Sequence, residues 1–142
     1  MSKPEVIEQT ESYVESIFGA GTGEAHVRFL DRIQNPALRE MIHRYHALEA
    51  DTLRLSLQEN YLIGMCVLCA QRDYQTAALF AKTLLHLGVH KEKLLEASAR
   101  LAMWVGGLPA VDASFTVQKA IREYEREGLG SLSVWFPEEP AK

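Results

Sequence analysis

Two cysteines, Cys66 and Cys69, have the spacing of a redox-active dithiol. In such a pair one thiolate attacks a peroxide and the second thiol resolves the product, so the pair defines one hypothesis, a peroxiredoxin-type peroxidase. Both cysteines lie inside an apolar run, YLIGMCVLCA. Burial raises a thiol pKa, and helix geometry hinders a disulfide between positions i and i+3. Inert core cysteines are the alternative interpretation.

A second group of candidate ligands is His43, His46 and Glu49, which are spaced to share one face of a helix. The alternative is an exposed polar face. No fourth ligand and no supporting shell of hydrogen-bonding residues can be identified in the sequence. We therefore expect no metal and no other cofactor.

Composition and charge narrow the class of protein. The 142 residues are 47% hydrophobic, which suits one globular domain spanning 1–142. The net charge of -4 arises from acidic and basic residues mixed along the chain, so neither a nucleic acid nor an anionic membrane is an expected partner. No apolar window reaches the ~18 residues of a membrane span, and the N-terminus lacks a secretory signal. The expected location is cytoplasmic.

Helix signals dominate the chain. The stretch from Ala37 to Leu108 contains no proline and is rich in helix-forming residues, so we predict an all-α fold of six to seven helices. N-terminal helices are expected within 4–50, a core within 55–127 and a tail over 128–142 that docks through Trp135 and Phe136, either on its own domain or on a neighbouring subunit. The segment 61–70 is expected to be a central helix buried on most faces.

Hydrophobic periodicity also predicts which side chains of the other helices point inward. In the first helix these are Val6, Ile7, Tyr13, Val14, Ile17 and Phe18. In the later helices they are Leu38, Met41, Ile42, Tyr45, Leu48, Leu94, Leu95, Leu101, Met103, Trp104, Val111, Phe115, Ile121 and Tyr124.

Three segments, in this order and spacing, carry a family resemblance: LSLQENYLIG (55–64), GVHKEKLLEA (88–97) and GGLPAVDAS (106–114). Together they resemble the carboxymuconolactone decarboxylase family, which includes the AhpD-like alkylhydroperoxidases. The resemblance covers about half of the chain, from Leu57 to Tyr124. It implies an AhpD-like helical bundle that assembles as a trimer or a hexamer.

The redox positions of that family hold other residues here. Counting back from Gly88 places the family's glutamate, its two cysteines and its histidine at Tyr61, Asp73, Thr76 and Phe80. None of these can supply a dithiol. The decarboxylase branch also lacks the cysteines, but it typically keeps histidines at the Phe80 position and near Arg100. This sequence departs from both branches.

The resemblance implies a pocket lined by Tyr61, Asp73, Thr76, Phe80, Arg100 and Trp104. The first hypothesis is therefore a cofactor-free lyase- or isomerase-type enzyme acting on a small anionic carbonyl or lactone compound. Arg100 would bind the anion, while Asp73 and Tyr61 would transfer protons.

Each assignment has a structural alternative. Arg100 can pair with Glu96 on the helix surface, Asp73 can cap a helix, and Tyr61 can be a core residue. The second hypothesis is a non-catalytic member of the family that binds a small molecule or serves as an oligomeric structural protein. The third hypothesis is the peroxidase at Cys66 and Cys69.

Overall fold

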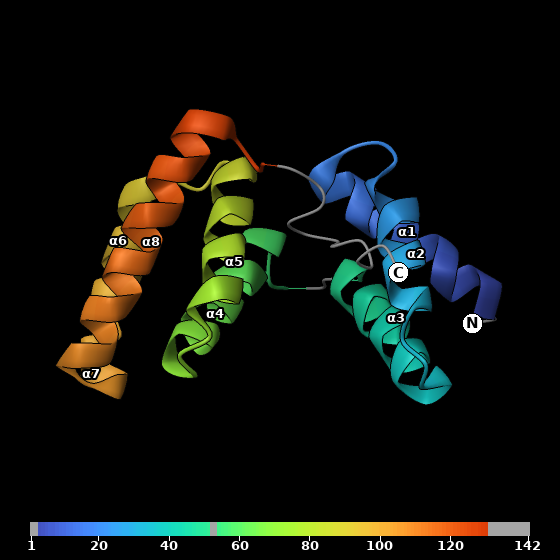
Figure 1. The fold of residues 1–142 in the computed structure, drawn as a ribbon, viewed down its shortest axis with the longest axis horizontal. Helices are drawn as coiled ribbons and strands as arrows, with labels where there is room; N and C mark the ends of the chain where they lie inside the picture. The colour runs from blue at the N-terminus through green and yellow to red at the C-terminus, as the bar shows by residue number, and fades with distance from the viewer. Residues whose placement is uncertain (1–2, 52–53, 131–142) are drawn as a thin grey trace, which may run out of the picture. The chain divides into compact units, whose positions relative to one another are not determined.

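A computed structural model describes residues 3–51 and 54–130, and every regular element in these ranges is a helix (Figure 1). The predicted all-α class is confirmed. Seven of the described helices have ten residues or more, and α7 is a four-residue turn. The chain divides into two compact units, which we call the first unit (helices α1 to α3, before Leu55) and the second unit (Leu55–Gly130). The prediction of a single domain over 1–142 stays a prediction.

The first unit is built on α1 (Lys3–Phe18), against which α2 (Thr22–Asp31) and α3 (Pro36–Ala50) both pack. Gly23 allows a close approach of α1 and α2, because a Cβ at that position would overlap the backbone carbonyl of Glu11. Asn35 caps α3 by accepting hydrogen bonds from the amides of Ala37 and Leu38. Pro36 occupies the first turn, where proline needs no backbone N–H partner. The buried apolar residues of this unit are Val6, Tyr13, Val14, Ile17 and Leu30.

The second unit contains α4 (Leu57–Ala70), α5 (Tyr74–His86), α6 (Lys91–Arg100), α7 (Ala102–Val105) and α8 (Gly107–Glu127). Helix α5 packs against α4 and α8, and α6 runs alongside α8 with α7 at its end (Figure 1). The resulting core is apolar, and its centre is formed by Met65, Leu84, Leu94, Val117 and Ala120. The boundaries of this unit, 55–130, lie close to those of the segment that resembles the family core, 55–127.

Local hydrogen bonds define the starts of α4 and α5. Ser56 and Glu59 form a reciprocal capping box at α4, with bonds of 3.1 and 2.7 Å. Asp73 caps α5 by accepting the Thr76 amide at 3.1 Å. These short-range bonds stabilise both helix starts.

The prediction for the buried face of α3 is wrong. Four of the residues expected inside, Leu38, Met41, Tyr45 and Leu48, are exposed, and Leu48 is 71% exposed. Ile42 is half-buried. His43, which was assigned to an exposed polar face, is only 5% exposed. The apolar face of an amphipathic helix needs an apolar partner, but that partner need not belong to the same chain.

The predictions for the region around α7 also fail in part. Met103, Trp104, Val111 and Phe115 were expected inside and are exposed, whereas Ile121 is buried as predicted. Helix α4 is not buried on most of its faces either, because Ile63 and Val67 are exposed while Met65 and Cys69 are buried. The described residues include no helix long and apolar enough to span a membrane. Trp135 and Phe136 lie outside the described residues.

Candidate functional site

The three predicted catalytic residues have structural roles in the second unit. Asp73 is exposed, and its hydrogen bonds with Thr76 lower the pKa of its carboxyl, whereas proton transfer near neutral pH would need a raised pKa. The Arg100 guanidinium pairs with the Glu96 carboxylate at 2.8 and 3.2 Å, and its side chain is 67% exposed. Both residues therefore match the structural alternatives drawn from the sequence.

The two aromatic rings Tyr61 and Phe80 of the predicted pocket are in contact. The rings of Tyr61 and Phe80 lie 4.9 Å apart between centroids, and both pack against the apolar core. Phe80 also lies over Gly64, where a Cβ would come within 2.6 Å of its ring. Trp104, in contrast, is 82% exposed on α7. The structure thus brings together two pairs of the predicted pocket residues, Tyr61 with Phe80 and Asp73 with Thr76, and the interactions it shows for the described residues join Arg100 to Glu96 instead.

Cys66 and Cys69 are free thiols on α4. Cys69 is buried. Its desolvation, with a smaller electrostatic contribution from the nearby Cys66, raises the pKa of its thiol to about 11. Burial also raises the pKa of the Cys66 thiol. A peroxidatic cysteine needs a lowered pKa so that the thiolate is populated. The environment of both cysteines favours inert thiols.

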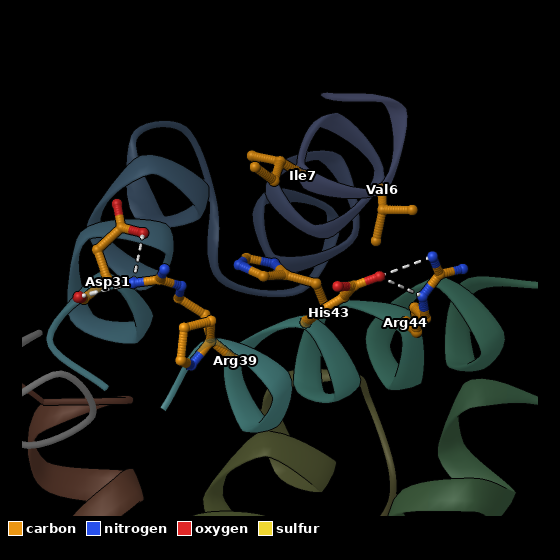
Figure 2. A pocket seen from close by; sticks show the side chains of 8 residues that line it. Val6, Ile7, Asp31, Arg39, His43 and Arg44 are labelled. Carbon is orange, nitrogen blue, oxygen red and sulfur yellow. Dashed lines mark hydrogen bonds and ion pairs between the residues drawn. The ribbon is translucent and has the colours of Figure 1, made fainter. Parts of the chain in front are cut away.

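The first unit contains a small pocket lined by residues of α1, α2 and α3 (Figure 2), which the sequence did not predict. Its volume is about 100 Å³, well below the ~300 Å³ at which sites for drug-sized ligands begin. His43 lies at its centre, below the apolar side chains of Val6 and Ile7. The full lining is Val6, Ile7, Asp31, Pro36, Arg39, Glu40, His43 and Arg44.

The charges around this pocket are paired with one another. Arg44 donates to Glu40 at 2.8 and 3.1 Å. Arg39 donates to the backbone carbonyl of Asp31 at 3.2 Å and lies 3.9 Å from its carboxylate. The formal charges of these four side chains cancel. The pocket therefore suits a few-atom ligand that contacts apolar carbon and the imidazole of His43.

Beside the pocket, two further histidines form a chain of polar contacts with Glu49. His26 Nε2 lies 2.9 Å from His46 Nε2, and His46 Nδ1 lies 3.4 Å from the Glu49 carboxylate. One tautomer satisfies both contacts: His46 donates from Nδ1 to Glu49 and accepts at Nε2 from His26. We call His26, His46 and Glu49 the imidazole chain. His43 is separate, because its Nδ1 contacts Thr10 Oγ1 at 3.1 Å.

The pKa values in the imidazole chain follow from burial and proximity. Burial lowers the pKa of His26 to about 4, with contributions from His46 and His43. Burial alone would raise the pKa of Glu49, but hydrogen bonds from His46, Tyr45 and Tyr13 produce a net lowering. The arrangement favours a neutral His26 and an ionised Glu49 at neutral pH.

His43, His46 and Glu49 do not come together as a set of metal ligands. No group of three histidine, cysteine, aspartate or glutamate side chains within residues 3–51 and 54–130 is placed to hold a metal ion. His43 and His46 contact different helices instead, Thr10 on α1 and His26 on α2. His26 was missed from the sequence because it lies twenty positions before its partner and no local pattern joins the two.

Each unit carries a group of exposed apolar side chains. The α7–α8 patch comprises Met103, Trp104, Leu108, Val111 and Phe115. The α3 stripe comprises Leu38, Met41, Tyr45 and Leu48. Exposed apolar side chains that recur at helical spacing are a feature of protein interfaces.

Comparison of the chain with family models, curated proteins and solved structures finds no match. The resemblance to the carboxymuconolactone decarboxylase family therefore stays a prediction.

Proposed function

We propose that this protein acts as a helical subunit of a homo-oligomer, in the manner of a non-catalytic, carboxymuconolactone decarboxylase-like protein. One observation carries the proposal: the α7–α8 patch places a tryptophan that is 82% exposed among four other exposed apolar side chains. Tryptophan and methionine are enriched at protein interfaces, and tryptophan is frequent among residues that dominate binding energy. A second copy of the chain is the partner that the family resemblance favours, in trimers or hexamers.

Self-association through this patch is tested by the molar mass of the purified protein. Light scattering after gel filtration should give a multiple of the 16.0 kDa chain mass. Trp104→Glu replaces the most exposed apolar side chain of the patch with a charge and should weaken association about tenfold or more. Arg122→Glu is the matched control, because Arg122 is exposed on α8 outside the patch and its replacement should leave the mass unchanged. A wild-type protein that is monomeric at every concentration overturns the proposal.

Small-molecule binding is a second candidate function, and the pocket at His43 favours it. A native mass spectrum should reveal a small bound molecule that His43→Gln reduces. If the spectrum of the wild-type protein contains only the chain, a resident ligand is excluded for the protein as purified.

The enzyme hypothesis remains open to direct test. If Arg100 binds an anionic carbonyl or lactone compound, Arg100→Ala should abolish binding, and unchanged binding would refute that role. The peroxidase hypothesis requires reactive thiols, and Cys66 and Cys69 should instead resist a thiol-specific reagent until the protein unfolds. Rapid modification of the folded protein would favour the peroxidase hypothesis over the other two.

A further inference from the structure

The imidazole chain joins two helices that both pack against α1. His26 lies on α2 and His46 lies on α3, and their Nε2 atoms are 2.9 Å apart. At this distance one nitrogen donates a hydrogen and the other accepts it. The Nδ1 atom of His46 faces the Glu49 carboxylate at 3.4 Å, and the two side chains are 18% and 15% exposed. This contact between α2 and α3 therefore depends on a single hydrogen between two rings.

We propose that His26 and His46 form an acid-sensitive latch between α2 and α3, which stays closed with one added proton and opens when a second is added. A neutral imidazole carries one N–H group and an imidazolium carries two. With one ring protonated, the other ring still accepts at Nε2. With both rings protonated, two N–H groups and two positive charges would face each other at 2.9 Å, so the hydrogen bond is lost and the charges repel.

The first added proton belongs on His46, because the Glu49 carboxylate beside it stabilises a positive ring. His26 then carries its hydrogen on Nδ1 and accepts at Nε2, so the hydrogen bond reverses direction and persists. Burial, with contributions from His46 and His43, lowers the pKa of His26 from 6.5 to about 4. Since the fold favours the neutral ring of His26, the closed latch is fully stable above pH 6.5 and weakens as the pH falls toward 4.

The other ionisable groups around the latch keep this sign. They come from all three helices: Tyr13 on α1, Arg32 at the end of α2, and His43, Tyr45 and Glu49 on α3. Both tyrosines donate hydrogen bonds to Glu49 and so favour its ionised form. Arg32 lies over the Phe29 ring, which stacks on His26, and its positive charge opposes a further cation. One carboxylate balances one imidazolium, so the second proton adds an unbalanced charge.

Other contacts of the first unit persist when the histidines are protonated. Thr10 donates to the Val6 carbonyl at 2.9 Å, so its oxygen accepts from His43 Nδ1 at 3.1 Å, and an imidazolium keeps that donor. Near the connection between α2 and α3, Arg39 donates to the backbone carbonyl of Asp31 at 3.2 Å. The latch lies five residues from Asp31 and seven from Arg39, roughly 8–10 Å along the two helices. Opening is therefore expected at the ends of α2 and α3 that lie beyond these contacts.

Histidine NMR of the full-length protein tests the latch. With nitrogen-15-labelled histidine, a scalar coupling between His26 Nε2 and His46 Nε2 across the hydrogen bond is expected at pH 7 and at pH 6. The coupling should vanish near pH 4, where both rings should show the nitrogen shifts of imidazolium. A pair without coupling at pH 7, or with coupling that persists after both rings are protonated, would overturn the proposal.

Two substitutions of His26 separate charge from acid. His26→Lys brings a positive charge at pH 7, so amide exchange in residues 44–50 of α3 should become about tenfold faster or more. His26→Gln cannot take up a proton and should keep these residues protected near pH 4. His86→Lys is the matched control, because it makes the same change at an exposed position of the second unit and should leave residues 44–50 unaffected. Equal exchange in His26→Lys and the wild-type protein would contradict the latch.

The exchange of α1 distinguishes the latch from general acid unfolding. Near pH 4, α2 and residues 44–50 should lose protection while α1 keeps it, after correction for the intrinsic pH dependence of exchange. An equal loss in α1 would mean that the whole first unit unfolds, and the latch would be refuted. The latch uses no residue of the α7–α8 patch, so it goes beyond the proposed function and does not depend on it.

Discussion

The interiors of the two units differ in chemistry. The first unit buries His43 and Thr10 and partly buries the imidazole chain among its helices. The second unit is built on apolar side chains, and Lys82, a buried charged residue of that unit, is paired with Glu123 at 2.6 Å. Burial of apolar area stabilises a fold largely independently of pH, whereas a partly buried imidazole ties stability to pH. The second unit should therefore tolerate pH changes that destabilise the first.

The largest effect is expected from a cavity in the apolar core of the second unit. Leu84 is fully buried there, so Leu84→Ala should lower the free energy of unfolding by about 2–5 kcal/mol in a denaturant titration. Leu55→Ala is the control, because Leu55 is half exposed and should cost far less. Similar losses for the two variants would contradict the assignment of Leu84 to the core.

A pair of glycine substitutions compares how rigidly each unit is packed. Gly23→Ala should cost about 1–3 kcal/mol, since the added methyl group meets the backbone of α1, which cannot move aside locally. Gly64→Ala meets the ring of Phe80, a side chain that can rotate, and should cost less. Thermal unfolding measures both. A greater loss for Gly64→Ala would reverse this part of the comparison.

Acidification should destabilise the first unit selectively. Because the pKa of His26 is lowered from 6.5 to about 4, the fold favours the neutral imidazole. The resulting stability is fully present above pH 6.5 and is lost as the pH falls toward 4, a loss on the order of 2 kcal/mol after allowance for solvent screening.

Hydrogen exchange between pH 7 and pH 4.5, corrected for the intrinsic pH dependence of exchange, should locate this loss in α2 and α3. His26→Gln should reduce the pH dependence, whereas His90→Gln, at an exposed position of the second unit, should leave it unchanged. An equal loss of protection in α5 and α8 would mean that the pH response is not confined to the first unit.

The smallest effects are expected at the two helix caps. Asn35→Ala and Asp73→Ala should each cost about 1 kcal/mol, because each removes a side-chain acceptor from the first turn of a helix. Asp73→Asn should recover most of the loss, since an amide oxygen also caps. Full stability of Asp73→Ala would remove the structural explanation for this residue and favour its catalytic one.

Helix starts and stops were predictable because local chemistry sets them. Asp73 caps α5, which matches the structural alternative drawn from the sequence. Asn35 and Gly88 are residue types that favour a helix start and a helix stop, and Gly88 follows α5 with a positive φ of 85°. Amphipathic patterning also identified Val14 and Ile17 of α1 as core residues. These features depend on a few neighbouring residues.

The direction of an apolar face was not predictable in the same way. Periodicity shows that Met41 and Leu48 share a face of α3, but it cannot distinguish the interior of the chain from a surface that another chain covers. The burial of His43 depends on a hydrogen bond to Thr10, thirty-three positions away. The predicted pocket also depended on contacts between distant positions, whereas Arg100 pairs with Glu96 on its own helix.

The packing of α8 against both α5 and α6 also determines when the second unit can be completed during synthesis. The helices of the first unit are complete once the chain has been synthesised as far as Ala50. The core around Leu84 and Val117, in contrast, also needs α8, which has 21 residues and is synthesised after α5 and α6. At roughly 5–20 residues per second, a ribosome takes about 1–4 s to add it. During that interval the inner faces of α5 and α6 lack their partner, so the nascent second unit is the part of the chain most exposed to chaperones and to aggregation.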